Sequence, residues 1–130
     1  MLFEFMADPA RLDLWSFGTW QTDIAADGLV RGTSLFNGGE IYLRIAADQK
    51  TGLVDYLLGK QPDQLARRIY ARILPASDSG GPADAADLLL TALRTEDMDD
   101  TRWEDLKAAH AAEIRLIKAL IESGHDHRRS

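Results

Sequence analysis

Apolar and polar side chains alternate with a period of two through the middle of the chain, and one long stretch of helical period follows. Six segments alternate in this way: "SFGTWQTD", "LVRGTSLF", "EIYLRIAA", "LVDYLLG", "LARRIYARIL" and "ADLLLTALRT". This period predicts β-strands, because successive side chains of a strand point to opposite faces. Turn signals at Asp27-Gly28 and residues 37–39, 48–52 and 59–63 separate the first five segments. Strands joined by such short turns form an antiparallel meander with one covered face.

The stretch "TRWEDLKAAHAAEIRLIKALIES", residues 101–123, predicts the helix that covers this sheet. Thr101, with Glu104 three residues later, has the form of a capping box, and Gly124 is a suitable C-cap. We expect the apolar members of one helical stripe to be buried against the sheet. At about 100° per residue, that stripe contains Trp103, Leu106, His110, Ile114, Ile117 and Ile121.

The N-terminal segment "LFEFMADPARLDLW" predicts two short helices. They separate at Asp8-Pro9, because the residue before a proline is disfavoured in the helical region, and Pro9 can begin the second helix. The whole chain is thus predicted to form an α+β fold with about six antiparallel strands. Residues 1–124 are expected to form a single domain, and residues 125–130 a polar C-terminal tail that frays.

Composition narrows the classes of partner. The chain has 130 residues, enough for one domain, and a formal net charge of −6 with no basic run before its last residues. This balance argues against binding to nucleic acid or to an anionic membrane surface. The absence of cysteine excludes disulfides. Glu4 and Asp8 lie where a secretory signal would be apolar, so we expect a cytoplasmic protein.

Three segments, "FEFMADPARLDLW", "DGLVRGTSL" and "RWEDLKAAHAAEIRLIKALIE", resemble parts of one superfamily. They are similar to the opening helix, the following strand pair and the closing helix of START-like proteins, the SRPBCC superfamily of polyketide cyclase/dehydrase-like domains. The resemblance spans nearly the whole chain. It implies a helix-grip fold, in which a curved antiparallel sheet wraps around a long C-terminal helix. It also implies a cavity between sheet and helix, which in this superfamily holds hydrophobic ligands.

One feature of that superfamily is missing from this sequence. Its members usually have an apolar strand before the first helix, whereas this chain begins inside that helix. Either the true start lies upstream, or the sheet has six strands. A sheet that lacks the strand would have an open edge, which proteins normally cover or pair. We therefore expect a homodimer or another means of covering the edge.

His110 is the main candidate for a site residue, because it is a polar group in the middle of the apolar stripe. It is either a polar anchor inside the ligand cavity or a core histidine bonded to protein groups. A buried polar group left without a partner costs about 1–3 kcal/mol, so a partner is expected in both cases. Glu113 lies at the edge of the stripe. It is either a second anchor or the partner of an arginine on the sheet, for which Arg44, Arg72 and Arg94 are available.

Aromatic and basic residues supply the remaining candidates. The full set of predicted ligand contacts is His110, Glu113, Arg94, Tyr70, Tyr56, Tyr42, Trp20 and Trp103. Aromatic residues at alternating strand positions are more often core or surface residues than ligand platforms. The tripeptide "HDH", residues 125–127, has no other metal ligands near it in the sequence. No metal site and no cofactor are predicted.

Three functions follow from these patterns. The first is binding of a small hydrophobic or aromatic ligand in a cavity between the sheet and the C-terminal helix. The second is a polyketide cyclase/dehydrase-type enzyme that uses His110 as acid or base. The third is an interaction module without a cavity, in which the exposed sheet edge recruits a partner or a second copy.

Overall fold

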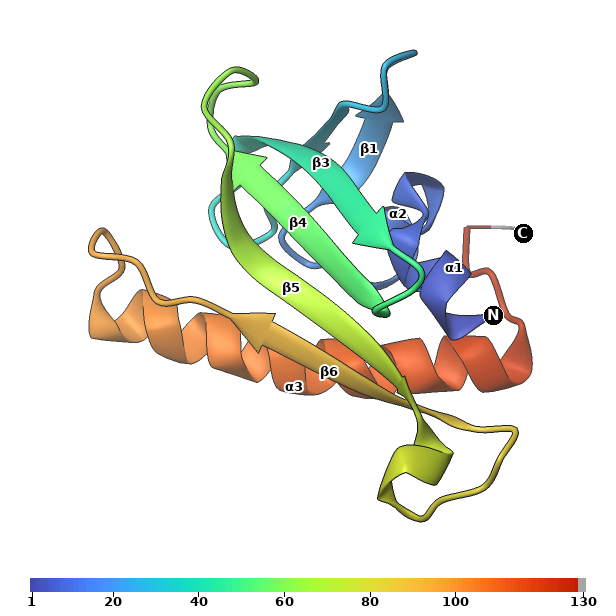
Figure 1. The fold of residues 1–130 in the computed structure, drawn as a ribbon. Coiled ribbons are helices and arrows are strands. Elements are labelled where there is room, and N and C mark those ends of the chain that lie inside the picture. The colour runs from blue at the N-terminus through green and yellow to red at the C-terminus, as the bar shows by residue number, and fades with distance from the viewer. Residues whose placement is uncertain (129–130) are drawn as a thin grey trace.

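One antiparallel sheet, one long helix and short N-terminal helices make up the computed structural model, which describes residues 1–128 (Figure 1). The predicted α+β fold is confirmed: six antiparallel strands form one curved, unclosed sheet beside a long C-terminal helix. In chain order the elements are α1 (Leu2–Ala7), the 3-10 turn η1 (Pro9–Arg11), α2 (Leu12–Trp15), β1 (Trp20–Ile24), β2 (Val30–Thr33), β3 (Glu40–Asp48), β4 (Leu53–Gly59), β5 (Ala66–Pro75), the 3-10 turn η2 (Ala76–Ser79), β6 (Ala86–Ala92) and α3 (Asp100–Ser123).

The strands pair in sequence order, so β1 and β6 form the two edges of the sheet within the described residues. The register shifts between Trp20 and Asp23 in β1, where Gln21 has a φ of 50°, and again between Tyr56 and Leu57 in β4. An irregularity of this kind bends the strand that carries it and increases the local twist. The sheet therefore curves over one side of the molecule, where the helices lie (Figure 1).

One face of the sheet is apolar because apolar residues on neighbouring strands pair with one another. Leu43 pairs with Leu58, and Tyr56 pairs with Ile69. Both pairs lie on the side covered by the helices, and they belong to or pack against the core cluster. That cluster consists of Met6, Leu12, Leu14, Trp15, Val30, Leu43, Val54, Tyr56, Leu58, Ala71, Ile117 and Leu120.

The short N-terminal helices lie between the sheet and the C-terminal half of α3. Asp8 is extended, with a φ of −90°, and its carboxylate accepts the N–H of Ala10, so α1 ends before Pro9 as predicted. The ring of Trp15 meets the ring of Tyr56 edge to face at 5.8 Å. The Tyr56 hydroxyl donates to the carbonyl of Met6 at 2.5 Å. These contacts fix α1 and α2 against the middle of the sheet.

The start of α3 differs from the prediction. Asp99, not Thr101, is the N-cap: its backbone is extended and its carboxylate accepts the N–H of Arg102 at 2.7 Å. Aspartate is as good an N-cap as threonine, and here it begins the helix two residues earlier. The predicted C-cap is confirmed, because Gly124 has a φ of 68°, which suits a residue without a side chain.

The buried stripe of α3 is rotated from the predicted one. Leu106 and Ile117 are buried as expected, but Ile114 is 36% exposed. The helix instead buries Ala109 and Glu113. Alanine lets the helix approach its neighbours closely, and a hydrogen bond described below holds the Glu113 carboxyl inside.

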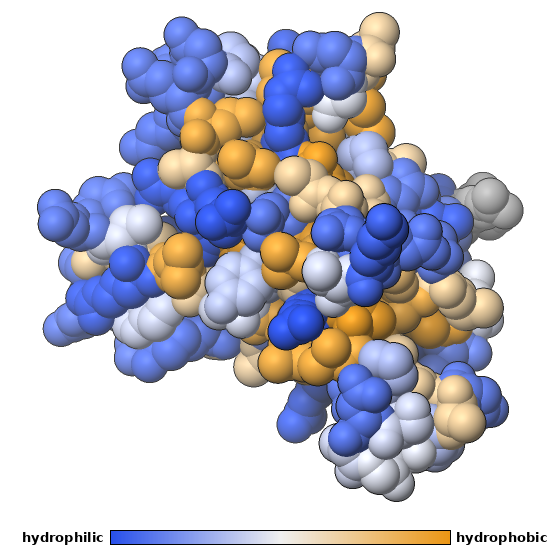
Figure 2. Space-filling view, in the orientation of Figure 1, coloured by the Kyte–Doolittle hydropathy of each residue, from blue (hydrophilic) through white to orange (hydrophobic). Residues whose placement is uncertain are grey.

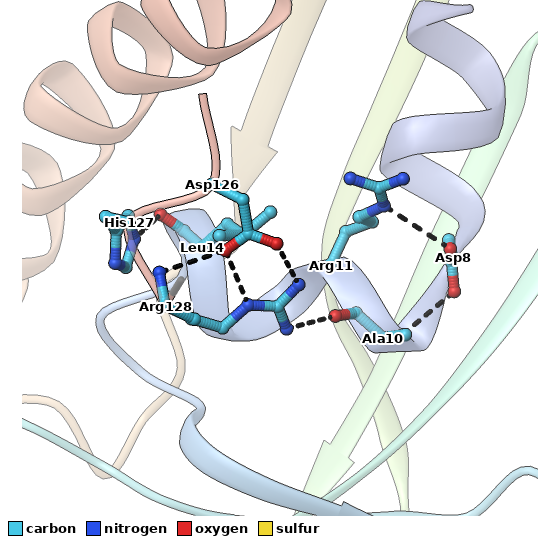
Figure 3. A network of polar contacts seen from close by, with 7 residues as sticks. All are labelled: Asp8, Ala10, Arg11, Leu14, Asp126, His127 and Arg128. Carbon is cyan, nitrogen blue, oxygen red and sulfur yellow. Dashed lines mark hydrogen bonds and ion pairs between the residues drawn. The ribbon is translucent and has the colours of Figure 1, made fainter. Parts of the chain in front are cut away.

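The beginning of the C-terminal tail lies against α2, although the sequence predicts fraying (Figure 3). A ring nitrogen of His127 is 3.1 Å from the carbonyl oxygen of Leu14. The guanidinium of Arg128 donates to the carbonyl of Ala10 at 2.8 Å and pairs with Asp126. Residues 129 and 130, also part of the predicted tail, lie outside the described residues. No helix within residues 1–128 has the length and hydrophobicity of a membrane span.

The rotated stripe makes two isoleucines on one helix a matched pair for mutagenesis. Ile117 is 1% exposed and Ile114 is 36% exposed. Ile117→Ala should lower the free energy of unfolding by about 2–5 kcal/mol, because it removes buried methyl groups and leaves a void. Ile114→Ala should cost less than about 1 kcal/mol. Urea denaturation of both variants measures this, and equal losses would mean that the helix does not pack as described.

Candidate functional site

A cavity of about 800 Å³ lies between the sheet and the N-terminal half of α3. Its volume is within the range of sites that hold small molecules. Its wall is contributed by residues of α2, β3, β4, β5 and α3, and by the segments that follow α2, β2, β4 and β6. The apolar lining consists of Leu12, Trp15, Phe36, Ile41, Leu43, Tyr56, Leu58, Ile69, Leu93, Met98 and Leu106.

Four residues of α3 face this cavity at helical spacing, namely Arg102, Leu106, His110 and Glu113. Residues three or four apart lie on one side of a helix, so these four form a continuous row along the cavity. The next residue of the row, Ile117, is 1% exposed and belongs to the packed core. Glu113 therefore marks the boundary between the cavity and the core.

Glu113 is a buried carboxyl group held by the main chain. Its Oε2 accepts the N–H of Phe17 at 2.9 Å, and its side chain is 5% exposed. Burial raises its pKa to about 7, and the hydrogen bond from Phe17 opposes this shift. The proposed pairing of Glu113 with an arginine of the sheet is not seen. Arg44 instead pairs with Asp27, and Arg94 pairs with Asp100.

His110 lies in the cavity wall one helical turn from Glu113. Its Nε2 is 3.8 Å from Oε1 of Glu113, too far for a hydrogen bond. Burial lowers the pKa of His110, so the imidazole is neutral near pH 7. Within the described residues its ring makes no hydrogen bond, and its side chain is 13% exposed. The structure thus places His110 as a polar group at the cavity and not as a bonded core histidine.

Tyr56 also lines the cavity, but as an apolar wall. Its hydroxyl is already used, since it donates to the carbonyl of Met6 at 2.5 Å. Burial raises the pKa of Tyr56, and the nearby charge of Glu113 raises it further. The phenol therefore stays protonated, and only its ring is available to a ligand.

The other five predicted ligand contacts lie outside the cavity wall. Tyr42 and Tyr70 alternate along their strands with Leu43 and Ala71, which belong to the core, so the two tyrosines point to the opposite face. The Tyr42 hydroxyl donates to Glu40 there. The remaining three are held elsewhere: Trp20 stacks against His127, Trp103 lies beside Lys107, and Arg94 pairs with Asp100.

Two residues of the wall that have buried donor atoms without a partner, Arg102 and Trp15, were not predicted from the sequence. The guanidinium carbon of Arg102 lies 4.2 Å from the centre of the Phe36 ring. Its Nη1 is buried and has no acceptor among the described residues, and the same is true of the indole Nε1 of Trp15. A signal for Arg102 was present, because it precedes Leu106 by four residues and so continues the buried stripe by one turn.

Known proteins give no direct guide to this site: neither the models of known families nor the curated proteins contain a match to this chain. Metal ligands do not gather in it either, since no three acidic or histidine side chains among the described residues could hold an ion together.

The raised pKa of Glu113 predicts a dependence of stability on pH. The folded pKa of about 7 exceeds the ordinary value of 4.5, so the protonated carboxyl favours the folded state. This stabilisation is fully present below pH 4.5 and is lost as pH rises through about 7. Relative to Glu113→Gln, the native chain should lose ~3 kcal/mol of unfolding free energy across this window. Denaturation at several pH values measures the loss.

A matched control is Glu104→Gln on the same helix, because the Glu104 side chain is 67% exposed. Its difference from the native chain should stay nearly constant with pH. If Glu113→Gln shows the same flat difference, the carboxyl of Glu113 is ionised and solvated in the folded protein.

Proposed function

We propose that the protein binds a small apolar or aromatic molecule in the cavity between the sheet and α3. The observation that carries this proposal is a space of about 800 Å³ whose wall combines apolar side chains with polar ones, among them the His110 ring, which has no hydrogen-bond partner in the described chain. Ligand sites typically combine apolar surface with polar groups that fix orientation. His110 is the proposed anchor for a polar atom of the ligand.

We also propose that the chain belongs to the START-like superfamily. The order of elements supports this, because two short helices precede an antiparallel meander and a long helix closes the fold. The cavity lies between the sheet and that helix, as it does in the superfamily. Fold does not determine chemistry, so the superfamily supports a cavity and not a particular ligand.

Acid–base catalysis is the second candidate function. It is favoured by Glu113, whose pKa is raised to about 7, close to the value at which a carboxyl can both take and give a proton. The neutral ring of His110 lies 3.8 Å away in the same wall. If the protein is such an enzyme, Glu113 is a better acid or base than His110, the residue that the sequence suggested for this role. Binding ranks first because it requires only the cavity.

Titration with the neutral fluorescent probe N-phenylnaphthylamine tests the binding proposal. One probe should bind per chain with a dissociation constant near or below the micromolar range. Gly18 lines the cavity, and a Cβ added there would meet only Phe36, at 3.8 Å. Gly18→Phe should therefore fit and fill the space, and probe binding should be lost. Ile24→Phe, at a position 43% exposed on β1, is the control and should bind normally.

The role of His110 is tested in the same titration with naphthol as a competitor. His110→Leu keeps the bulk of the side chain but removes its polar atoms. Naphthol should bind about tenfold or more weakly, as expected for one lost hydrogen bond, while the probe changes by less than about threefold. The stability of His110→Leu should hold or rise, because no protein group loses a partner. A destabilised variant with unchanged naphthol affinity would refute the anchor.

We further propose that β6 pairs with β6 of a second copy to form a homodimer. β6 is bonded to β5 on one side and is an edge of the sheet on the other. The N–H of Leu93 donates to Arg68 of β5, and the carbonyl of Ala85 accepts from Ala76, directly after β5. Because alternate residues point to opposite sides, the backbone groups of Leu88 and Leu90 face the open edge. Such an edge is a template for pairing with another chain.

The side chains of β6 suit a second copy of the same strand. Leu89 is 47% exposed, and just beyond the strand Leu93 is 42% exposed. Figure 2 shows hydrophobic residues gathered on this face along the strand. Asp87 is the one charged residue of β6 and lies near its start. Antiparallel pairing about a twofold axis keeps the two Asp87 side chains apart and brings the leucines together.

Light scattering on purified protein tests the dimer. The native chain should have twice the monomer mass, and Leu89→Lys should be monomeric, because charged side chains on an edge strand oppose pairing. Leu35→Lys is the control: Leu35 is 53% exposed but lies between β2 and β3, so this variant should remain dimeric. A monomeric native chain at high concentration would refute the proposal.

A further inference from the structure

We propose that the ligand carries a carboxylate, and that the guanidinium of Arg102 binds it. This inference rests on the proposed function, because it names the class of molecule that the cavity takes. The class is an elongated monocarboxylic acid with an apolar body. Two buried hydrogen-bond donors of the cavity wall have no partner in the described chain.

Arg102 is held in the wall by its own contacts. Its backbone N–H donates to the cap residue Asp99, and its guanidinium carbon lies 4.2 Å from the centre of the Phe36 ring. A guanidinium stacked on an aromatic face keeps its edge free for a planar partner. The Nη1 of Arg102 is buried and has no acceptor among the described residues. An arginine in this state lacks the carboxylate that usually neutralises it.

The neighbouring acids are committed to other cations. Asp97 lines the same cavity, but its carboxylate is 3.7 Å from the guanidinium of Arg68. Glu40 also lines it and is 3.6 Å from the guanidinium of Arg31. Among the described residues no carboxylate forms an ion pair with Arg102. An anion brought by the ligand would fill that place.

The wall contains a second buried donor without a partner. The indole N–H of Trp15 is buried without an acceptor, although its residue lines the cavity. Glu113, an acceptor in the same wall, already accepts from Phe17. Burial of a donor without a partner is unfavourable, and a bound acceptor relieves it. Both buried donors are therefore suited to a bound acceptor, which a carboxylate supplies and an alkylammonium group does not.

The row of residues on α3 sets the shape of the ligand. Arg102 and Glu113 are eleven residues apart on one helix, which corresponds to about 16 Å at the helical rise. Between them the wall is formed by Leu106 and His110 on the helix and by sheet residues such as Leu58. A molecule that reaches along this row has its carboxylate at Arg102 and its apolar body over Leu106 and Leu58.

Displacement of N-phenylnaphthylamine by decanoic acid and by decanol measures this preference directly. The two competitors share one chain and differ in the terminal group. The native protein should bind decanoate about tenfold or more tightly than decanol, as expected for hydrogen bonds to a charged group. Arg102→Gln should remove this preference and leave decanol binding within about threefold of native. Arg102→Lys should keep part of the preference, because lysine retains the positive charge but cannot donate two parallel hydrogen bonds to a carboxylate.

The control is Arg94→Gln, which makes the same change of charge at an arginine outside the cavity that pairs with Asp100. It should keep the full preference for decanoate. Equal affinities of the native protein for the acid and the alcohol would refute the inference and leave the proposed function intact. An equal loss of the preference for decanoate in Arg94→Gln and Arg102→Gln would also refute it, because the effect would then come from net charge. Failure of the neutral probe to bind at all would refute the proposed function itself.

Discussion

The hydrogen bond between the Glu113 carboxylate and the N–H of Phe17 joins parts of the chain that are 96 residues apart. It connects α3 to the segment that leads from α2 into β1, and so fixes how the long helix lies against the sheet. On one side of it, Ile117 and Leu120 pack into the core. On the other side, Leu106 and His110 face a cavity. One buried carboxyl thus divides the helix into a packed half and a half that borders an open space.

The difference between the two halves comes from the size of the side chains that face them. α1 and α2 bring Met6 and Leu14 to the packed half, and these are at most 1% exposed. The facing wall of the other half contains small residues from the loops and strand ends: Ser16, Gly18, Thr19, Ser34, Gly39 and Gly59. Small residues cannot fill the space beneath a straight helix, and the interior of a protein does not collapse freely into a void. The cavity follows from where the large side chains are missing.

Sequence periodicity was sufficient for the fold and for part of the site. The period of two located all six strands, and Asp8-Pro9 located the break between the short helices. His110 and Glu113 were found because ionisable groups on an apolar stripe are unusual. Tyr42 and Tyr70 were candidates only by residue type, and their strand positions point them away from the core. The burial of Ala109 in place of Ile114 could not be predicted, because it depends on the rotation of α3 that brings the Glu113 carboxyl to the N–H of Phe17.

The places where this protein departs from ordinary packing are concentrated at the cavity. Trp15 and Arg102 each have a buried donor atom without a partner, and both residues lie in its wall. Glu113, with a pKa raised to about 7, lies at its end. Each of these features lowers the stability of the free protein, since burial of an unpaired polar or charged group is unfavourable. Natural sequences carry such costs mainly at functional sites. A random scatter of such groups would indicate imperfect packing, whereas their concentration around one cavity supports the proposal that a small molecule binds there.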